Sequence, residues 1–377
     1  MSDLAIDRIQ VYVVAPETQR YAWADGMPEQ YMSNTILRLT ARGGLEGVAG
    51  AASCTDHLFD TAPAEALRPL LPALLGATPH EREALWHRLR PLNTPIHGQA
   101  QSLIDIALWD AAAKAAGLPL HRMLGGARTR ILSYASTPLL EDAAAYVDFV
   151  DRLRGEGFKA VKFHCWCDPA KDLPMVEAVQ ARHGGAGVAF MLDVEQRYDR
   201  AQALRAGRLL SELGWRWFEA PLLDFDLEGY AALRSRVDVP VIPAGNWILD
   251  PALLAVGIRM GCWSSLRVDA TICGGITPTR WIMGLAQAHG MTVELQCWGY
   301  TLTQAANLHL MLAYANCTYF EQPTPYPAFE HGALDVIRTD GEGYVHAPEG
   351  PGLGIRIDWE AVEKACVLRY ELRAGAS

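Results

Sequence analysis

The 377-residue sequence has no apolar stretch long enough to cross a membrane as a helix. Such a helix needs roughly 18 or more consecutive apolar residues, so we expect no membrane association. An excess of basic charge is also missing, because 33 Lys and Arg residues stand against 43 Asp and Glu, a formal net charge of −10. Without a basic run to contact phosphates, the sequence argues against nucleic acid as a partner.

Paired cysteine motifs are missing as well. The eight cysteines are scattered, and the tightest pair, Cys165 and Cys167, has no second pair to complete a zinc site. Scattered thiols in a long chain are typical of reduced cysteines. The first residues, Met1 to Leu4, contain no basic segment followed by an apolar core, so no secretory signal is visible. Together these absences predict a cytoplasmic protein.

An alternation of short strands and helices fills residues 131–330. The composition, 50% hydrophobic and 9% aromatic, excludes disorder as the main state. Eight β-branched or aromatic runs predict strands at 131–135, 160–165, 189–194, 215–220, 239–244, 265–270, 292–297 and 318–322. Eight strand–helix units of roughly 25–30 residues each are typical of a (β/α)8 barrel. A doubly wound open sheet is the alternative, but no Gly-x-Gly-x-x-Gly motif opens its first unit.

The two ends of the chain have a different texture. In residues 1–130 we expect a strand at 6–14, a polar and aromatic loop at 17–33, a second strand at 34–42 and a helical region at 64–116. Residues 331–377 return to loop and strand, with a turn-rich segment before a last helix. We therefore predict an α/β fold, a modified TIM (β/α)8 barrel at 131–330 with an α+β capping domain formed by both terminal segments.

Polar residues stand at the ends of the predicted barrel strands, so they recur once in each strand–helix unit. In such a barrel, functional side chains lie at the C-terminal ends of the strands. We therefore expect one axial site that collects Lys162, His164, Asp193, Glu195, Glu219, Asn246, Asp269, Gln296 and Glu321.

Most of these residues also have a structural interpretation. A lone acid at a strand end usually caps a helix or is solvated, but Asp193 and Glu219 lie within apolar strands. Burying an unpaired charge is costly unless a cation is present, and hard carboxylate ligands suit Mg²⁺. Lys162 is either an ion-pair partner of a carboxylate across the barrel or a catalytic base. His164 is equally compatible with a hydrogen-bonded core residue and with a functional one. Asp269 could merely pair with Arg267.

In combination these residues resemble the enolase superfamily, and within it the mandelate racemase/muconate lactonizing enzyme family. The resemblance covers nearly the whole chain and rests on residues 104–110, Leu124-Gly125-Gly126, Lys162-x-His164, Asp193, Phe218-Glu219-Ala220-Pro221, Gly274-Gly275-Ile276-Thr277 and Pro351-Gly352-Leu353-Gly354. It implies a capped, modified TIM barrel. It also implies Mg²⁺ held by three acidic residues on consecutive strands, and abstraction of the proton α to a carboxylate.

For the metal, the resemblance implies Asp193 and Glu219 as the first two ligands. The third acidic ligand is absent, because its position falls on Gly245 without a gap, or on Asn246 with a one-residue bulge. Asn246 could offer a neutral carbonyl oxygen, and Glu195 is a second possible replacement. We therefore expect Mg²⁺ to bind, with an affinity weakened by the missing acid.

For proton transfer, the resemblance assigns the base to a Lys-x-Lys motif, here Lys162 and His164. Burial and a neighbouring cation would lower the pKa of Lys162. Racemases of the family use an Asp–His dyad on the other face, where Asp269 matches but Gln296 replaces the histidine and cannot shuttle protons. Glu321 matches an acid that, when protonated, donates a hydrogen bond to the substrate carboxylate. Chemistry on one face is therefore favoured.

These assignments predict a lyase that dehydrates a hydroxylated carboxylate of acid-sugar type through an ene-diolate, with Lys162 or His164 as the base. A cycloisomerase or epimerase of the same family is the alternative, and so is a ligand-binding homologue without turnover. We expect a small-molecule carboxylate as substrate, contacted by Trp23, Glu195 and Trp298, and a homo-oligomeric protein. Loops of the cap, at 17–33 and near Ser53, should close over the barrel mouth.

Overall fold

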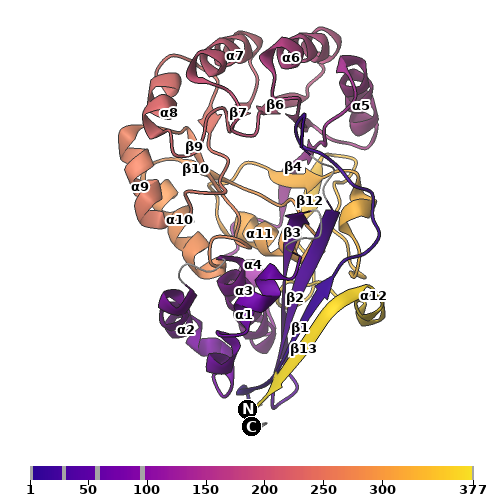
Figure 1. Cartoon of the computed structure of the whole chain (residues 1–377), viewed down its shortest axis with the longest axis vertical. Coiled ribbons are helices and arrows are strands. Elements are labelled where there is room, and N and C mark those ends of the chain that lie inside the picture. The colour runs from indigo at the N-terminus through magenta and orange to yellow at the C-terminus, as the bar shows by residue number, and fades with distance from the viewer. Residues whose placement is uncertain (1–2, 28–30, 56–59, 94–97, 376–377) are drawn as a thin grey trace.

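Both ends of the chain contribute to one antiparallel sheet. The computed structural model describes residues 3–27, 31–55, 60–93 and 98–375. Strands β1 (Ile6–Val14), β2 (Tyr31–Ala41) and β3 (Glu46–Thr55) follow one another, and β13 (Cys366–Arg373) pairs with β1, which gives the order β13-β1-β2-β3 (Figure 1). Sequence patterns did not indicate β3, which is rich in Ala and Gly, or β13, whose partner lies at the opposite end of the chain. The loop expected near Ser53 is the end of β3, and residues 56–59 lie outside the described residues.

Helices connect this sheet to the rest of the molecule. They are α1 (Ala62–Leu67), α2 (Arg82–Leu89), α3 (Gly98–Ala115) and α4 (Leu120–Met123), with short 3-10 segments at Leu71–Leu74, Pro79–Glu81 and Arg90–Asn93. Helix α3 is buried over most of its length, because it packs on β2 and β3 with one side and on α10 of the barrel with another.

Eight parallel strands and seven intervening helices form the barrel, which occupies the upper part of Figure 1. The strands are β4 (Arg130–Ser136), β5 (Ala160–His164), β6 (Ala189–Asp193), β7 (Trp217–Glu219), β8 (Val241–Ile242), β9 (Ser265–Val268), β10 (Thr292–Leu295) and β11 (Phe320–Pro323). The helices are α5 (Ala143–Gly155), α6 (Pro169–His183), α7 (Arg200–Leu213), α8 (Leu227–Arg234), α9 (Pro251–Met260), α10 (Ile276–Ala288) and α11 (Thr301–Ala313). The predicted fold class is confirmed.

The eight strands form a closed ring, but in the described residues the last strand is not followed by a barrel helix. The strand order is β11-β4-β5-β6-β7-β8, with β9 and β10 as a parallel pair, and the N–H of Ser264 donates to the carbonyl of Val241 across the gap between β8 and β9. After β11 the described chain continues into a 3-10 segment (Tyr326–Phe329) and β12 (Tyr344–His346), which pairs with β4. No eighth barrel helix follows in these residues; α12 (Trp359–Lys364) and β13 lead back to the cap.

An aspartate N-cap recurs at the beginning of five barrel helices. Asp142, Asp168, Asp199, Asp226 and Asp250 are the N-caps of α5 to α9, and each carboxylate accepts a hydrogen bond from a backbone N–H of the first turn. Such caps satisfy N–H groups that have no partner within the helix. The acids that cap helices are therefore distinct from the acids that end the strands.

Two motifs that carry the resemblance fix helix α3 in place, one to the barrel and one to the C-terminal segment of the cap. Asp105 of α3 accepts hydrogen bonds from the backbone N–H and the hydroxyl of Thr277, at 2.9 and 2.6 Å. Asp110 accepts from the backbone N–H of Leu353, at 2.7 Å. A Cβ at Gly275 would lie 2.3 Å from the Asp105 carboxylate, and one at Gly352 would lie 2.0 Å from that of Asp110. Only glycine therefore permits these contacts.

The inside of the barrel changes from apolar to charged along the strands. An apolar cluster comprises Tyr134, Ala160, Met191, Trp217 and Ile242. Two residues further along β5, β6 and β7, the inward side chains are those of Lys162, Asp193 and Glu219.

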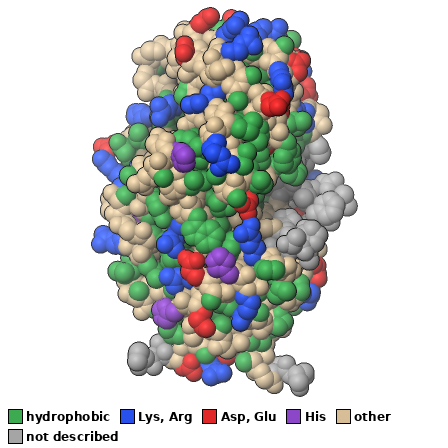
Figure 2. Space-filling model, turned by 90° about the vertical axis from the view of Figure 1, so that its left-hand side faces the viewer, with side chains coloured by type: hydrophobic (Ala, Val, Ile, Leu, Met, Phe, Trp, Pro, Cys, Tyr) green, Lys and Arg blue, Asp and Glu red, His purple; other side chains and the backbone are tan. Residues whose placement is uncertain are grey.

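On the outer face shown in Figure 2, basic and acidic side chains are intermingled rather than gathered into one charged area. Within the described residues, no helix is long and apolar enough to span a membrane.

Candidate active site

A cavity of about 540 Å³ opens at the C-terminal ends of the barrel strands. Its wall includes every site residue expected from the sequence: Trp23, Lys162, His164, Asp193, Glu195, Glu219, Asn246, Asp269, Gln296, Trp298 and Glu321. It also includes Arg267, to which the sequence analysis gave no role beyond a possible partnership with Asp269.

Lys162 lies at the centre of the charged layer. Its Nζ is 2.9 Å from Asp193 Oδ2, 2.9 Å from Glu219 Oε1 and 3.1 Å from Glu321 Oε1, and its side chain is only 2% exposed. An ammonium has three N–H groups to donate, so these three carboxylates match it fully. Burial lowers the pKa of Lys162, but the three carboxylates outweigh burial and the net shift is upward. Without an ion beside it, Lys162 is therefore held as a charged hydrogen-bond donor, and its role as a base stays a prediction.

Arg267 of β9 forms the second cation of this layer. Its Nε is 2.8 Å from Glu219 Oε1, its Nη2 is 3.0 Å from Glu321 Oε2, and its Nη1 donates to the hydroxyl of Tyr134 at 3.3 Å. The side chain is 2% exposed. An arginine within the apolar run Leu266-Arg267-Val268, with the same parity as Asp269, was the signal that could have marked it as part of the site.

Asp269 is held by neutral donors instead of by Arg267. Its Oδ1 accepts from the backbone N–H and the hydroxyl of Thr271, at 2.7 and 2.9 Å, and from Asn307 Nδ2 at 2.8 Å. Burial raises the pKa of Asp269 to about 6, although these hydrogen bonds oppose the rise. Among the described ion pairs none joins Asp269 to Arg267, because the guanidinium faces Glu219 and Glu321.

Gln296 faces the segment that follows β8, across the intervening strand β9. Its Nε2 donates to the backbone carbonyl of Ala244 at 2.5 Å and to Asn246 Oδ1 at 3.0 Å. The expectation that this amide is held beside Asp269 has no support among the described hydrogen bonds. The interaction also occupies the Asn246 oxygen that was expected to bind the metal.

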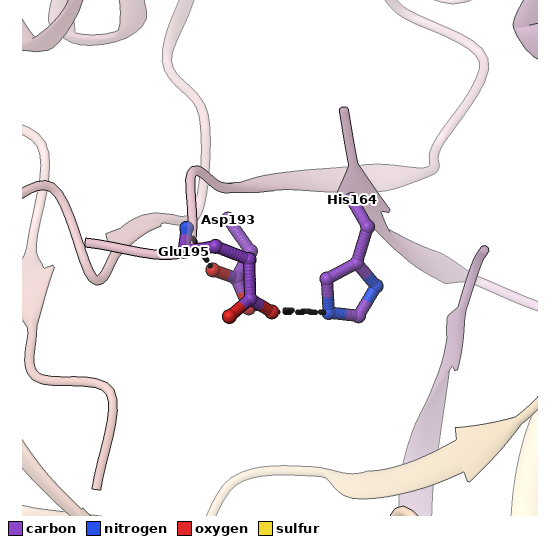
Figure 3. A group of neighbouring side chains, drawn as sticks. All are labelled: His164, Asp193 and Glu195. Atoms are coloured by element: carbon purple, nitrogen blue, oxygen red, sulfur yellow. Dashed lines mark hydrogen bonds and ion pairs between the residues drawn. The ribbon is translucent and has the colours of Figure 1, made fainter. Parts of the chain in front are cut away.

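His164 presents one free nitrogen to the cavity. Its Nδ1 lies 2.5 Å from the carbonyl oxygen of Thr137, and a carbonyl can only accept, so Nδ1 carries the proton in the neutral ring. Its Nε2 faces Asp193 Oδ2 and Glu195 Oε1, each 3.4 Å away (Figure 3). This is the tautomer that a general base or a metal-binding histidine requires.

Glu195 reaches this position through an unusual backbone. Glu195 and Gln196 have φ angles of +50° and +62°, in the left-handed region that side chains rarely adopt. The turn brings the Glu195 carboxylate back toward His164 (Figure 3). Burial and then repulsion from Asp193 raise the pKa of Glu195 to about 7. Glu195 is therefore suited to exchange protons near neutral pH.

Aromatic side chains form the cap side of the cavity. The ring of Trp298 lies 5.7 Å from His164 and 5.4 Å from Trp23, which belongs to the loop expected at 17–33. Asp25 of the same loop pairs with Lys171 at 2.8 Å, which ties the loop to the rim of the barrel. Residues 28–30 of this loop lie outside the described residues.

Family comparisons identify this architecture. The family model described as Enolase C-terminal domain-like matches residues 145–362, and that of the Mandelate racemase/muconate lactonizing enzyme N-terminal domain matches residues 8–125. The chain belongs to the mandelate racemase/muconate lactonizing enzyme family of the enolase superfamily. The resemblance stated from the sequence is confirmed.

Three relatives show the range of this family. Muconate cycloisomerase 1 of Rhodococcus opacus is 28% identical over 96% of this chain and 99% of its own. A solved structure from Pseudovibrio sp., described as a mandelate racemase/muconate lactonizing enzyme, is 41% identical, has a TM-score of 0.97 and covers 99% of this chain and 100% of its own. L-talarate/galactarate dehydratase of Salmonella typhimurium is 30% identical over 74% of this chain and 70% of its own. A variant of that dehydratase, solved with Mg and L-glucarate, has a TM-score of 0.88 at 24% identity, covering 98% of this chain and 94% of its own.

The expected Mg²⁺ ligands of this family member are already engaged. Glu219 Oε1 contacts Lys162 and Arg267, and its Oε2 accepts from Trp217 Nε1 at 3.1 Å. The Asn246 oxygen accepts from Gln296, and position 245 has no side chain. The set Asp193, Glu219 and Asn246 therefore does not fit a divalent ion in this arrangement.

A different group of donors converges beside that set. His164, Asp193 and Glu195 each offer one atom, and these atoms lie within 4.8 Å of one another. Because one donor is an imidazole, this group would favour a transition-metal ion over Mg²⁺. Such an ion would take the Nε2 lone pair of His164, so the group can serve as a metal site or as a base, but not as both at once.

Proposed function

We propose that this protein removes the proton α to the carboxylate of a small hydroxy acid and eliminates water, as a dehydratase of acid-sugar type. The observation that carries the proposal is the position of His164 Nε2, which faces the same cavity as the cations Lys162 and Arg267. Proton abstraction next to a carboxylate needs a base and positive charge for the resulting dianion. Both are available here within one enclosed mouth.

His164 is the base in this proposal, because Lys162 uses its three N–H groups on carboxylates. His164 takes the α-proton at Nε2, and the substrate carboxylate lies in the cavity whose wall includes Lys162 and Arg267. The same imidazolium then protonates the departing β-hydroxyl, so one C–H and one C–O bond break, a C=C bond forms and water leaves. The enol product becomes a 2-keto acid. Glu195 is within reach of His164 to exchange the proton with solvent.

The opposite face offers no matching base. Gln296 donates to Ala244 and Asn246 and cannot relay a proton, so we expect reaction of one stereochemical configuration only. Glu321 accepts from Ser136 Oγ and from the N–H of Cys297, each at 3.0 Å, and contacts both cations. Burial raises its pKa, but Lys162 and Arg267 outweigh burial and lower it overall. We therefore expect Glu321 to hold the two cations as a carboxylate, rather than to donate a proton.

The relatives support the reaction class and leave the product open. Some are dehydratases and others are cycloisomerases, and both activities can start from the same abstracted proton. Relatives of the dehydratase group have been solved with Mg and L-glucarate. For this chain we route no step through Mg²⁺, because the donors expected to bind it are engaged.

The test is a panel of acid sugars and aryl hydroxy acids in D₂O, followed by NMR for α-deuterium incorporation and for keto-acid formation, with EDTA or with Mg²⁺. We expect a keto acid from one configuration of the substrate. His164→Asn keeps an N–H for the Thr137 carbonyl but lacks a basic nitrogen, so its turnover should fall by about 10²–10⁴-fold. A lactone product would instead indicate a cycloisomerase. Stabilisation by a ligand without any product would indicate a binding protein.

A further inference from the structure

Position 245, where the family's third acidic ligand would fall, cannot carry a side chain in this fold. Gly245 has a φ of +74°, and a Cβ there would lie 2.5 Å from the backbone oxygen of Arg267 and 2.9 Å from its Cγ. Real Cβ contacts are not this short. A side chain at position 245 would thus clash first with the backbone of Arg267 and then with the base of its side chain.

The Arg267 guanidinium puts a permanent positive charge next to the second expected ligand. Arginine does not deprotonate in proteins, and Nε of Arg267 lies 2.8 Å from Glu219 Oε1. Lys162 Nζ lies 2.9 Å from the same oxygen. A divalent ion bound to Glu219 would be repelled by two cations at close range in a buried site, where charge interactions are strong.

We propose that Arg267 replaces the divalent ion as the charge that balances Glu219 and Glu321, and that it closes the Asp193–Glu219 pair to Mg²⁺. Arg267 is then a positioning residue that holds two carboxylates around Lys162. Its consequence for catalysis, turnover without Mg²⁺, rests on the proposed function. The metal-binding part does not, because it can be measured without any substrate.

Wild-type protein gives a test that is independent of any variant. Crystals soaked in MnCl₂ are examined by anomalous scattering, and Mn²⁺ binding in solution is followed by electron paramagnetic resonance. We expect no ion within coordination distance of Glu219 and an unchanged Arg267. An ion held only by His164, Asp193 and Glu195 would support the proposal, because Glu219 is still not a ligand. An ion between Asp193 and Glu219, with Arg267 displaced, would overturn it.

Two substitutions of Arg267 then test the cause. Arg267→Met removes the charge but keeps a long side chain, so it should bind Mn²⁺ at least tenfold more tightly than wild type, and Mn²⁺ should raise its Tm. Arg267→Lys keeps the charge and is the matched control, with binding like that of wild type. Equal Mn²⁺ affinity in wild type and Arg267→Met would contradict the proposal. If Arg267→Met folds only with Mn²⁺ present, that dependence itself supports the replacement of an ion by Arg267.

Activity measurements distinguish the exclusion of Mg²⁺ by Arg267 from the proposed dehydratase function. EDTA-treated wild type should keep its turnover on any substrate that the panel identifies. Loss of turnover in EDTA with recovery in Mg²⁺ would overturn the inference and leave the dehydratase proposal intact. Absence of turnover on every substrate, with no Mn²⁺ at Glu219, would instead contradict the proposed function alone.

Discussion

Two regions of this molecule bury carboxylates deeply, and they stabilise them in different ways. At the junction of cap and barrel, Asp105 is 2% exposed and accepts hydrogen bonds only from the N–H and hydroxyl of Thr277 among its described hydrogen bonds. At the barrel mouth, Glu321 is 1% exposed and contacts Lys162 and Arg267. Neutral donors fix the position of a backbone, whereas cations keep a carboxylate charged. The family motifs therefore include both structural acids and acids of the site.

The electrostatic consequence has opposite signs in the two regions. Burial raises the pKa of Asp105 to about 7, and the hydrogen bonds from Thr277 only reduce that rise. Burial also acts to raise the pKa of Glu321, but Lys162 and Arg267 outweigh it and the net shift is downward. A buried acid held mainly by neutral donors thus favours its proton, and one in direct contact with two cations favours its charge. The following substitutions separate these two cases.

The largest effect should come from removing the central cation. Lys162→Met leaves Glu219 and Glu321 with Arg267, and Asp193 with His164, as their described ion-pair partners. We therefore expect a loss of about 3–5 kcal/mol in the free energy of unfolding, as for broken buried ion pairs. Urea denaturation measures the loss. A change below about 1 kcal/mol, typical of surface pairs, would show that these carboxylates do not depend on Lys162.

A smaller loss is expected at the junction. Asp105→Asn replaces one carboxylate oxygen by an amide N–H₂, so one of the two Thr277 donors loses its acceptor, at a cost of about 1–3 kcal/mol. Thr277→Ser keeps both donors and serves as the control, with a smaller loss. Urea denaturation of the two variants should rank them in this order, and the reverse ranking would contradict the assignment of Asp105 to a purely structural role.

The pH dependence of the junction should follow from the raised pKa of Asp105. Because its pKa in the folded state lies above the value of 3.8 for an unperturbed Asp, its contribution is full below about pH 4 and is lost as the pH rises through about 7. The stability advantage of wild type over Asp105→Asn should therefore shrink between about pH 4 and pH 7. An advantage that stays constant over this range would show that Asp105 is ionised throughout.

The smallest effect is expected for a lysine at the edge of the junction. Lys114 pairs with Asp110 at 2.6 Å, but its side chain is 27% exposed and Asp110 also accepts from two backbone N–H groups. Lys114→Met should cost about 0–1 kcal/mol. It makes the same chemical change as Lys162→Met, so comparable losses in the two variants would remove the contrast between the regions.

The sequence by itself determined the barrel and the membership of the site. The strand period of two residues and the convergence of parallel strand ends are local and repeating features. They bring the expected side chains at the barrel strand ends into one cavity, which Trp23 joins from the cap loop. Strands β3 and β13 escaped prediction because one has few β-favouring residues and the other depends on a partner at the far end of the chain.

Only the tertiary structure decided which charges meet. Arg267 could have paired with Asp269 two residues away, yet it contacts Glu219 of β7 and Glu321 of β11. Gln296 likewise contacts Ala244 and Asn246 after β8, and Lys162 is a charged donor because three strands each supply a carboxylate around it. The charge state of a buried group depends on distances between side chains from different strands. A pattern along one chain fixes which residues face the barrel axis, but not how far apart their charged atoms lie.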